Sequence, residues 1–518
     1  MAKYKTSKIN QTVFLQVSLP DQLIKGTIEF AINMLVDTRL NLSGFDNRYK
    51  NDQTGSPAYD PRVLLKIVLY GYSLGIISSR RLEKACRRNT VFMALAGGQH
   101  PDHSKIAAFI SSMSDEITPL FSNVLLICDE MKLLGGTEFA LDGLKLPSNA
   151  SKRWSGKMYD LQKKKERLEV KVKKMLSDHV EEDKVEDQDT SEKINKDKKI
   201  EKLIKNAERI ERFLKENEAK PGKQYKEIKS NITDNDSAIM QTSHGAIQGY
   251  NAQALVDSKH QIIVQADAFG TGTDHHHLEP VIDGAKENMV AIGHTEEYFK
   301  DKILSADTSY HSTENIKKCE EEQIDAYIPD KEYRKRHPEL SINETSKASR
   351  KKKYQREDFH YDDKTDQYEC PQGKMLKCNA ARVKINGVIY RRYRAEVMDC
   401  EACTARPECI NNKGKKGKRR TLMIAVSSEE RNYSKEMAQK IDTEPARKIY
   451  PHRAAIVEPV FANIRTQKRL DRFGLRGKIK VNIQWKLYCM IHNIEKNSKL
   501  WSWVCGRLKL DLACFGAG

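Results

Sequence analysis

Apolar side chains in the first quarter of the chain recur at the three- and four-residue spacing of a buried helix face. The clearest run follows Pro61, a residue that suits the first turn of a helix, and its apolar members are Leu64, Leu65, Ile67, Val68, Leu69 and Tyr72. A turn at Gly75 then leads into the arginine-rich segment 82–88. This spacing predicts that residues 12–135 are mostly helical.

Two short helices about a glycine turn are typical of a helix-turn-helix, whose second helix contacts DNA. A solvated helix face explains the arginines of segment 82–88 equally well. We interpret residues 1–135 as an N-terminal all-helical DNA-binding domain and keep the second explanation open.

From residue 136 onward the pattern changes to short apolar runs of strand character. These runs are residues 137–142, 249–256, 261–266, 303–307 and 326–329. The first ends in Asp142 and the fourth in Asp307, while a four-residue turn separates the second from the third. Helical stretches begin near Asp274 and Thr313. This order predicts an α/β fold over residues 136–500, with a mixed sheet and helices on its faces.

Two charged segments interrupt that region. Residues 151–230 contain two helical stretches separated by an acidic segment, which predicts an inserted helical hairpin. Residues 331–445 are basic and rich in cysteine, and we interpret them as a second insertion. Residues 501–518 form a C-terminal tail whose pattern predicts no structure.

Charge indicates the class of partner. The 518 residues include 90 Lys and Arg against 72 Asp and Glu, a formal net charge of +18. Such an excess favours a polyanionic partner, most often nucleic acid. The chain contains no apolar run of about 18 residues, and Met1–Asn10 have no apolar signal segment. We therefore expect a cytoplasmic protein that binds DNA and no membrane.

Three carboxylates are candidates for chemistry. Asp142 and Asp307 each end an apolar strand, and Glu458 lies near the start of an amphipathic helix. Together they can hold two Mg²⁺ ions, the arrangement that supports in-line phosphoryl displacement. An aspartate at a strand end is, however, more often a turn or helix-capping residue.

The cysteines between residues 370 and 409 suggest a metal site. Cys400 and Cys403 form a Cys-x-x-Cys pair, and Cys370 and Cys409 complete four thiolate ligands for a tetrahedral Zn²⁺, leaving Cys378 spare. A redox pair or inert thiols are the alternatives.

Three adjacent histidines, His275–His277, follow Asp274. Successive helical residues point in different directions, so the three rings cannot all face one ion. We expect a helix N-terminus here, capped by Asp274.

Several short motifs, taken in chain order, resemble a bacterial insertion-sequence DDE transposase with a ribonuclease H-like core. They are Tyr59-Asp-Pro-Arg62, Leu141-Asp-Gly-Leu-Lys-Leu-Pro-Ser-Asn-Ala150, Thr233-Asp-Asn-Asp236, Gly249-Tyr-Asn-Ala-Gln253, Ser305-Ala-Asp-Thr-Ser-Tyr310 and Val457-Glu-Pro-Val-Phe-Ala-Asn-Ile-Arg465. The resemblance spans nearly the whole chain. Related transposases also carry a similar cysteine-rich, zinc-ribbon-like insertion between the second Asp and the Glu.

The resemblance implies roles for individual residues. Asp142, Asp307 and Glu458 correspond to the catalytic carboxylates that bind divalent metal, Mg²⁺ or Mn²⁺. The last helix resembles the family's Tyr-Arg-Glu-Lys signature, with Tyr450 and Arg453 before the Glu and with Arg465 in place of the usual Lys. Arg465 keeps the charge but changes the phosphate geometry. Tyr450, Arg453, Arg465 and Lys145 are the candidate phosphate contacts. Gln484 stands where close relatives have Glu.

The resemblance also implies a reaction. The protein would bind the terminal inverted repeats of its element as a homodimer, hydrolyse DNA at the element ends and transfer the 3′-hydroxyl ends to target DNA. The sequence leaves two alternatives open: a catalytically inactive or domesticated DNA-binding regulator, and a Mg²⁺-dependent DNA nuclease without strand transfer.

Overall fold

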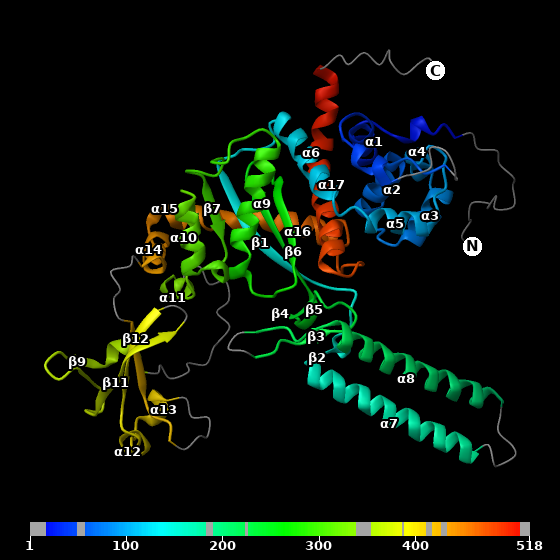
Figure 1. The fold of residues 1–518 in the computed structure, drawn as a ribbon. Helices are drawn as coiled ribbons and strands as arrows, with labels where there is room; N and C mark the ends of the chain where they lie inside the picture. The colour runs from blue at the N-terminus through cyan, green and yellow to red at the C-terminus, as the bar shows by residue number, and fades with distance from the viewer. Residues whose placement is uncertain are drawn as a thin grey trace, which may run out of the picture. The chain divides into compact units, whose positions relative to one another are not determined.

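The computed structural model describes residues 17–48, 57–182, 190–222, 226–337, 354–385, 388–410, 417–425 and 432–507. The chain divides into two compact units. The larger unit combines Met1–Asp330 with Met437–Gly518, and the smaller one is Lys331–Glu436. Figure 1 shows the course of the chain through both.

The first part of the larger unit is helical, as predicted. Its helices are α1 (Ile28–Thr38), α2 (Pro61–Ser73), α3 (Ser79–Arg88), α4 (Thr90–Leu95), α5 (His103–Ser111) and α6 (Ile117–Glu130). Pro61 occupies the first turn of α2, and the Asp60 side chain accepts a hydrogen bond from the Arg62 N–H (2.7 Å). Gly75 has a φ of +71°, so it supplies the left-handed turn between α2 and α3.

The sheet of the larger unit is mixed, which confirms the predicted fold class at that level. Its strands are β1 (Glu138–Pro147), β4 (Ala238–Thr242), β5 (Gly245–Asp257), β6 (Ile263–Phe269), β7 (Ile303–Ala306) and β8 (Asp325–Tyr327). The order is β6-β5-β1-β7-β8, with β4 also paired to β5. β5 is antiparallel to β1, β4 and β6, whereas β7 is parallel to β1 and β8. This arrangement is compatible with a ribonuclease H-like core.

Helices cover both faces of this sheet (Figure 1). α9 (Leu278–Ala291) packs on β5 and β6, and its Asn288 donates a hydrogen bond to the Gln265 side chain (2.7 Å). α16 (His452–Ala462) packs on β1 next to Asp142. Because paired residues of antiparallel strands point to the same face, the register puts Gln265 and Asp142 on opposite faces. α10 (Thr313–Glu321) connects β7 to β8.

α17 (Lys478–Arg507) joins the sheet to the N-terminal helices. It packs against α1, α2 and α6, and Tyr488 stacks on Tyr72 with ring centroids 5.2 Å apart. On its other side, Asn482 and Asn493 exchange hydrogen bonds with the backbone of β6. These bonds cover the outer edge of β6, which would otherwise present unpaired backbone groups.

Two long helices lie between β1 and β4 in the chain, in agreement with the expected helical pair. They are α7 (Met158–Glu182) and α8 (Thr190–Glu216), which run side by side (Figure 1). At their base, the short strands β2 (Ser155–Gly156) and β3 (Ser230–Asn231) pair with each other. That this pair is an insertion into the core fold stays a prediction.

The smaller unit is built on an antiparallel sheet. Its strands follow the order β13-β12-β11-β10-β9: β9 (His360–Asp362), β10 (Gln367–Glu369), β11 (Met375–Ile385), β12 (Val388–Arg394) and β13 (Thr421–Ala425). The short helices α11 (Tyr333–Arg336), α12 (Val397–Glu401) and α13 (Arg406–Cys409) complete it. α14 (Tyr433–Ile441) and α15 (Glu444–Ile449) lead back to α16.

Two sequence-based boundaries were wrong. β1 does not end at Asp142 but continues to Pro147, because the long β5 keeps pairing with it as far as Gly249. α17 continues past residue 500 to Arg507, so the expected tail begins inside a helix, and residues 508–518 lie outside the described ranges. No helix among the described residues is both long and apolar enough to cross a membrane.

Candidate active site

Asp142 and Asp307 lie at adjacent positions of neighbouring parallel strands. The register pairs Leu141 of β1 with Ala306 of β7, and the two aspartates follow these residues directly. Neighbouring strands are roughly 5 Å apart, so the two carboxylates are close enough for their charges to interact. β7 ends at Ala306 while β1 continues, and this divergence opens the sheet beside Asp142.

Asp142 is partly buried and paired. Its Oδ1 accepts a hydrogen bond from the Gly143 N–H, and its Oδ2 accepts one from Nη1 of Arg453, each at 2.8 Å. The two side chains are only 26% and 15% exposed. Burial raises the pKa of Asp142 above its usual range; the Arg453 charge opposes this shift, and the Asp307 charge adds to it.

Asp307 has a local role as well. Its Oδ1 accepts a hydrogen bond from the Thr308 N–H (2.7 Å), so it caps the short 3-10 turn Thr308–Tyr310. The alternative interpretation of this residue as a turn cap is therefore correct. Such a bond uses one carboxylate oxygen and leaves the other available for a ligand.

Arg453 lies in the first turn of α16, where the charges of both aspartates and of Tyr450 act on it. Burial acts to lower the pKa of its guanidinium, but the charges of Asp142, Tyr450 and Asp307 outweigh burial and raise it. Tyr450 is half-buried just before the helix. The structure therefore gathers these four side chains.

Glu458 and Arg465 lie farther along the same helical segment and are exposed. Arg465 belongs to the π-helical turn Asn463–Gln467. Within the described ranges, no three His, Cys, Asp or Glu side chains are placed so that together they can hold a metal ion. Glu458 is thus outside any common ligand set with Asp142 and Asp307.

Lys145 lies on the sheet face opposite Asp142. Its Nζ is 3.7 Å from the carboxylate of Asp274, which also accepts hydrogen bonds from Asn251 and Gln253. Gln253 in turn accepts a hydrogen bond from the hydroxyl of the buried Tyr310. This network is a polar layer behind the strands that bear the aspartates. The motif that contains Lys145 and the motif that contains Asn251 and Gln253 were each recognisable in the sequence. Nothing in the sequence alone indicated that the two motifs meet.

The expected cap at Asp274 was wrong. α9 begins only at Leu278, and Asp274–His276 form a 3-10 turn whose aspartate binds the β5 side chains. His277 is buried, stacks on Phe269 with ring centroids 4.2 Å apart and pairs with the Thr271 hydroxyl (2.6 Å). Burial lowers the pKa of His277 to about 4. This ring is therefore a packed, neutral side chain.

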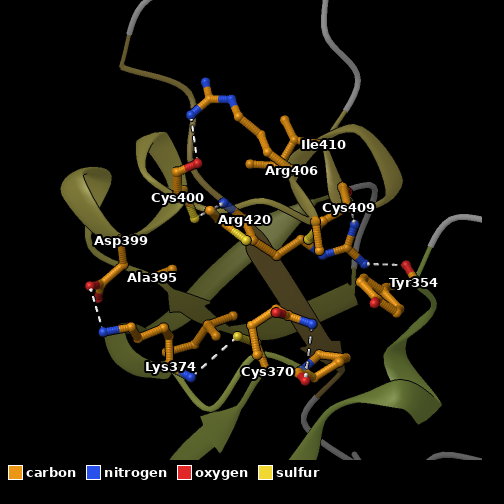
Figure 2. Close-up of a pocket in the computed structure, with 15 residues that line it drawn as sticks. Tyr354, Cys370, Lys374, Ala395, Asp399, Cys400, Arg406, Cys409, Ile410 and Arg420 are labelled. Carbon is orange, nitrogen blue, oxygen red and sulfur yellow. Dashed lines mark hydrogen bonds and ion pairs between the residues drawn. The ribbon is translucent and has the colours of Figure 1, made fainter.

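The four candidate zinc ligands line one cavity of about 30 Å³ in the smaller unit. Figure 2 shows Cys370, Cys400 and Cys409 around it, and Cys403 is the fourth. Cys370 Sγ accepts the Lys374 N–H (3.3 Å), and Cys400 Sγ accepts the Arg420 N–H (3.4 Å).

Burial raises the pKa of Cys409, and the nearby thiols Cys370, Cys400 and Cys403 act in the same direction. Cys378, the predicted spare cysteine, does not line the cavity. The four cysteines predicted as ligands are therefore the four that line this cavity, although their sulfur atoms do not form a metal-binding set. The zinc assignment stays a prediction.

Two family models match the chain. One, described as a transposase DDE domain, matches residues 369–497, a range that includes the four candidate zinc ligands and α16. The other, described as a transposase domain (DUF772), matches residues 17–112 and includes α1 to α5. No curated protein matches the chain.

The fold and the site define an α/β protein with an acidic pair on two neighbouring interior strands of a mixed sheet. Both matched models describe transposase domains, which confirms the resemblance to an insertion-sequence DDE transposase seen in the sequence. The transposase family implies DNA as the substrate.

Proposed function

We propose that this transposase binds the terminal inverted repeats of its insertion sequence, hydrolyses a DNA phosphodiester bond at each end and transfers the 3′-hydroxyl ends to target DNA. The observation that carries the proposal is the parallel pairing of β1 with β7, which puts Asp142 and Asp307 at adjacent positions beside α16. An acidic pair in a chain of net charge +18 suits chemistry on a polyanion.

Asp142 and Asp307 would hold the divalent cations, and Glu458, which lies outside a common ligand set with them in this structure, would join them when DNA and metal bind. Carboxylate oxygens are the ligands that Mg²⁺ and Mn²⁺ prefer, and the Arg453 guanidinium at Asp142 indicates that this carboxylate accommodates a positive charge. Two such ions, when bound, stabilise the attacking and leaving oxygens of an in-line displacement.

The other candidate residues would contact the phosphates of the DNA. Arg453 holds Asp142 in place, and its planar group of N–H donors also matches a phosphate. Tyr450 and the exposed Arg465 are on the same segment, so they can follow the DNA backbone away from the aspartates. Lys145 is tied to Asp274, and we assign it a weaker contact.

Three further assignments belong to this proposal. The N-terminal helices bind DNA through α3. The four cysteines of the smaller unit hold a structural Zn²⁺. Two copies of the chain act together as a homodimer, because the two element ends must be joined to one target.

The test is cleavage and joining of duplexes that carry the element ends, with Mg²⁺ or Mn²⁺. Asp142→Asn, Asp307→Asn and Glu458→Gln should each bind the ends but cut at least about 100-fold more slowly, the scale of losing one transition-state contact. Glu444→Gln on α15 is the matched control, since its side chain is 80% exposed and, among the described residues, pairs with Lys448 alone.

The products separate the alternatives. Cut ends that become joined to target support the transposase reaction. Cutting without joining would indicate a nuclease, and tight binding without cutting by the wild type would indicate a DNA-binding regulator. Normal cutting by all three variants would exclude these residues as the catalytic set.

A further inference from the structure

A basic groove lies where β1 ends and the α7–α8 pair begins. Its volume is about 620 Å³. Four cationic side chains line it, and no carboxylate does: Lys152, Arg209, Arg472 and Arg476. All four are exposed, and none forms an ion pair within the described part of the chain. We call this feature the basic groove.

The groove has a fixed floor. The segment 472–476 carries two of the arginines and is tied to the end of β1, since the Phe473 N–H binds the Pro147 carbonyl (2.9 Å) and the Asn149 side chain binds the Gly474 carbonyl (3.0 Å). Arg476 returns a hydrogen bond to the Asn149 carbonyl (2.8 Å). Three bonds of this kind hold the arginines in position before any ligand arrives.

Gln484 of α17 supports the same segment. Its Oε1 accepts hydrogen bonds from the N–H groups of Gly474 (2.9 Å) and Leu475 (3.3 Å). The glutamine that departs from the expected Glu is therefore a structural acceptor under the groove. Its side chain is buried, at 1% exposure.

Trp154 forms one wall and holds cations over its ring. Lys164 Nζ is 4.3 Å and Arg209 Cζ 5.6 Å from the indole centroid. Arg209 also donates a hydrogen bond to the Thr233 hydroxyl (2.9 Å). Because cations already lie over the indole, the wall presents positive charge and not a free ring for a base to stack on.

We infer that the basic groove binds the phosphate backbone of the element-end DNA, a few nucleotides away from the bond that is cut. This inference rests on the proposed function. β1 connects the two sites: five residues separate Asp142 from Pro147 (147 − 142), about 17 Å at roughly 3.3 Å per strand residue. At about 3.4 Å per nucleotide along one strand, that distance corresponds to roughly five nucleotides.

Backbone contact explains the composition of the groove better than base recognition does. Specific base readout needs side chains that enter a groove of the DNA, whereas a concave surface lined by arginine and lysine suits phosphates. The groove should therefore position the DNA and contribute affinity that depends on salt but not on sequence.

The test compares two triple variants of the full chain. Lys152→Gln, Arg209→Gln and Arg472→Gln remove three charges from the groove. Lys171→Gln, Lys173→Gln and Lys174→Gln remove three exposed charges from α7, outside the groove lining. Affinity for a labelled end duplex is measured against KCl concentration, and thermal melting checks that both proteins are folded.

The groove variant should lower the slope of log affinity against log salt by up to about 2.7, at roughly 0.9 for each lost phosphate contact. In the groove variant, ethylation of the phosphate about five nucleotides from the cut should no longer interfere with binding. The α7 variant should keep the wild-type slope and interference pattern.

An unchanged slope in the groove variant, with wild-type cutting intact, would overturn the inference and leave the proposed function standing. Equal losses in both variants would also overturn it, because they would reflect net charge and not a site. Failure of the wild type to bind or cut the ends would instead reject the proposed function.

Discussion

At the scale of single residues, the candidate site depends on a balance of charge between Asp142 and Arg453. Each is mostly buried, and each would be left with an uncompensated charge if its partner were removed. The raised pKa of Asp142 means that this carboxylate takes up a proton more readily than an exposed aspartate does.

His277 gives a prediction for stability against pH. Its pKa is about 4 in the folded chain and about 6.5 when unfolded, so below pH 6.5 the unfolded chain takes up a proton that the folded chain does not. Stability should therefore fall as pH drops from 6.5 to 4, by up to about 3 kcal/mol from this residue.

Urea unfolding between pH 7 and pH 4.5 measures this effect. His277→Gln should be less stable at pH 7, because it loses the stacked ring, but should lose less stability on acidification. His260→Gln, at an exposed position, is the control and should follow the wild type. Identical acid sensitivity in His277→Gln and wild type would show that the ring does not titrate as described.

At the scale of elements, α3 has one buried side and one basic side. Leu82 and Cys86 are fully buried, while its cationic residues are exposed: Arg80, Arg81, Lys84, Arg87 and Arg88. Gly71 of α2 fits under Leu82, since a Cβ at Gly71 would lie 2.1 Å from a Leu82 methyl group. The close α2–α3 packing and the turn at Gly75 present the basic side of α3 outward, as a DNA-contacting helix requires.

Removing that charge should weaken DNA binding. Arg81→Gln, Lys84→Gln and Arg88→Gln together should reduce affinity for the element ends by at least about tenfold at 0.15 M salt, equivalent to about 1.4 kcal/mol. The α7 lysine variant described above is the charge-matched control. Equal affinity of the α3 variant and wild type would favour the solvated-face explanation of these arginines.

The elements also show what the sequence could predict. Helical spacing and strand alternation are local properties, so the N-terminal helices, the hairpin β5–β6 and the helix pair α7–α8 could be predicted. The length of β1 could not, because Leu144 and Leu146 remain extended through pairing with a strand about 100 residues away. The network of Asp274 with Asn251 and Gln253 was missed for the same reason.

At the scale of the whole molecule, the smaller unit has little apolar core. Its buried cluster consists of six residues among those described: Phe359, Tyr368, Leu376, Tyr393, Ala395 and Leu422. A small apolar core supplies limited stability, which a metal or disulfides can supplement, and the described cysteines are free thiols. Three of the four candidate ligands, Cys370, Cys400 and Cys409, pack beside this core, and Cys403 lines the same cavity, so zinc at this place would support the unit.

Zinc analysis tests this expectation. The purified chain should contain one Zn²⁺, and Cys403→Ser should lose it together with part of the thermal stability. Removal of the metal by a chelator should lower the free energy of unfolding of this unit by several kcal/mol, because structural zinc contributes directly to folding. Cys378→Ser is the matched control and should keep its metal. Full stability after chelation would show that the unit does not depend on zinc.

The pairing of β2 with β3 at the base of the α7–α8 pair has a consequence for the order of folding. Pairing Pro147 with Gly249 must close a loop of 102 residues (249 − 147), but Ser155 already pairs with Asn231, which takes 76 of them (231 − 155) out of the loop. The effective loop then has 26 residues (102 − 76), and closing it costs about 1 kcal/mol less in chain entropy than closing the full loop. The helix pair, which forms through local contacts, should therefore assemble first and speed the meeting of β1 with β5, the step that creates the surroundings of Asp142.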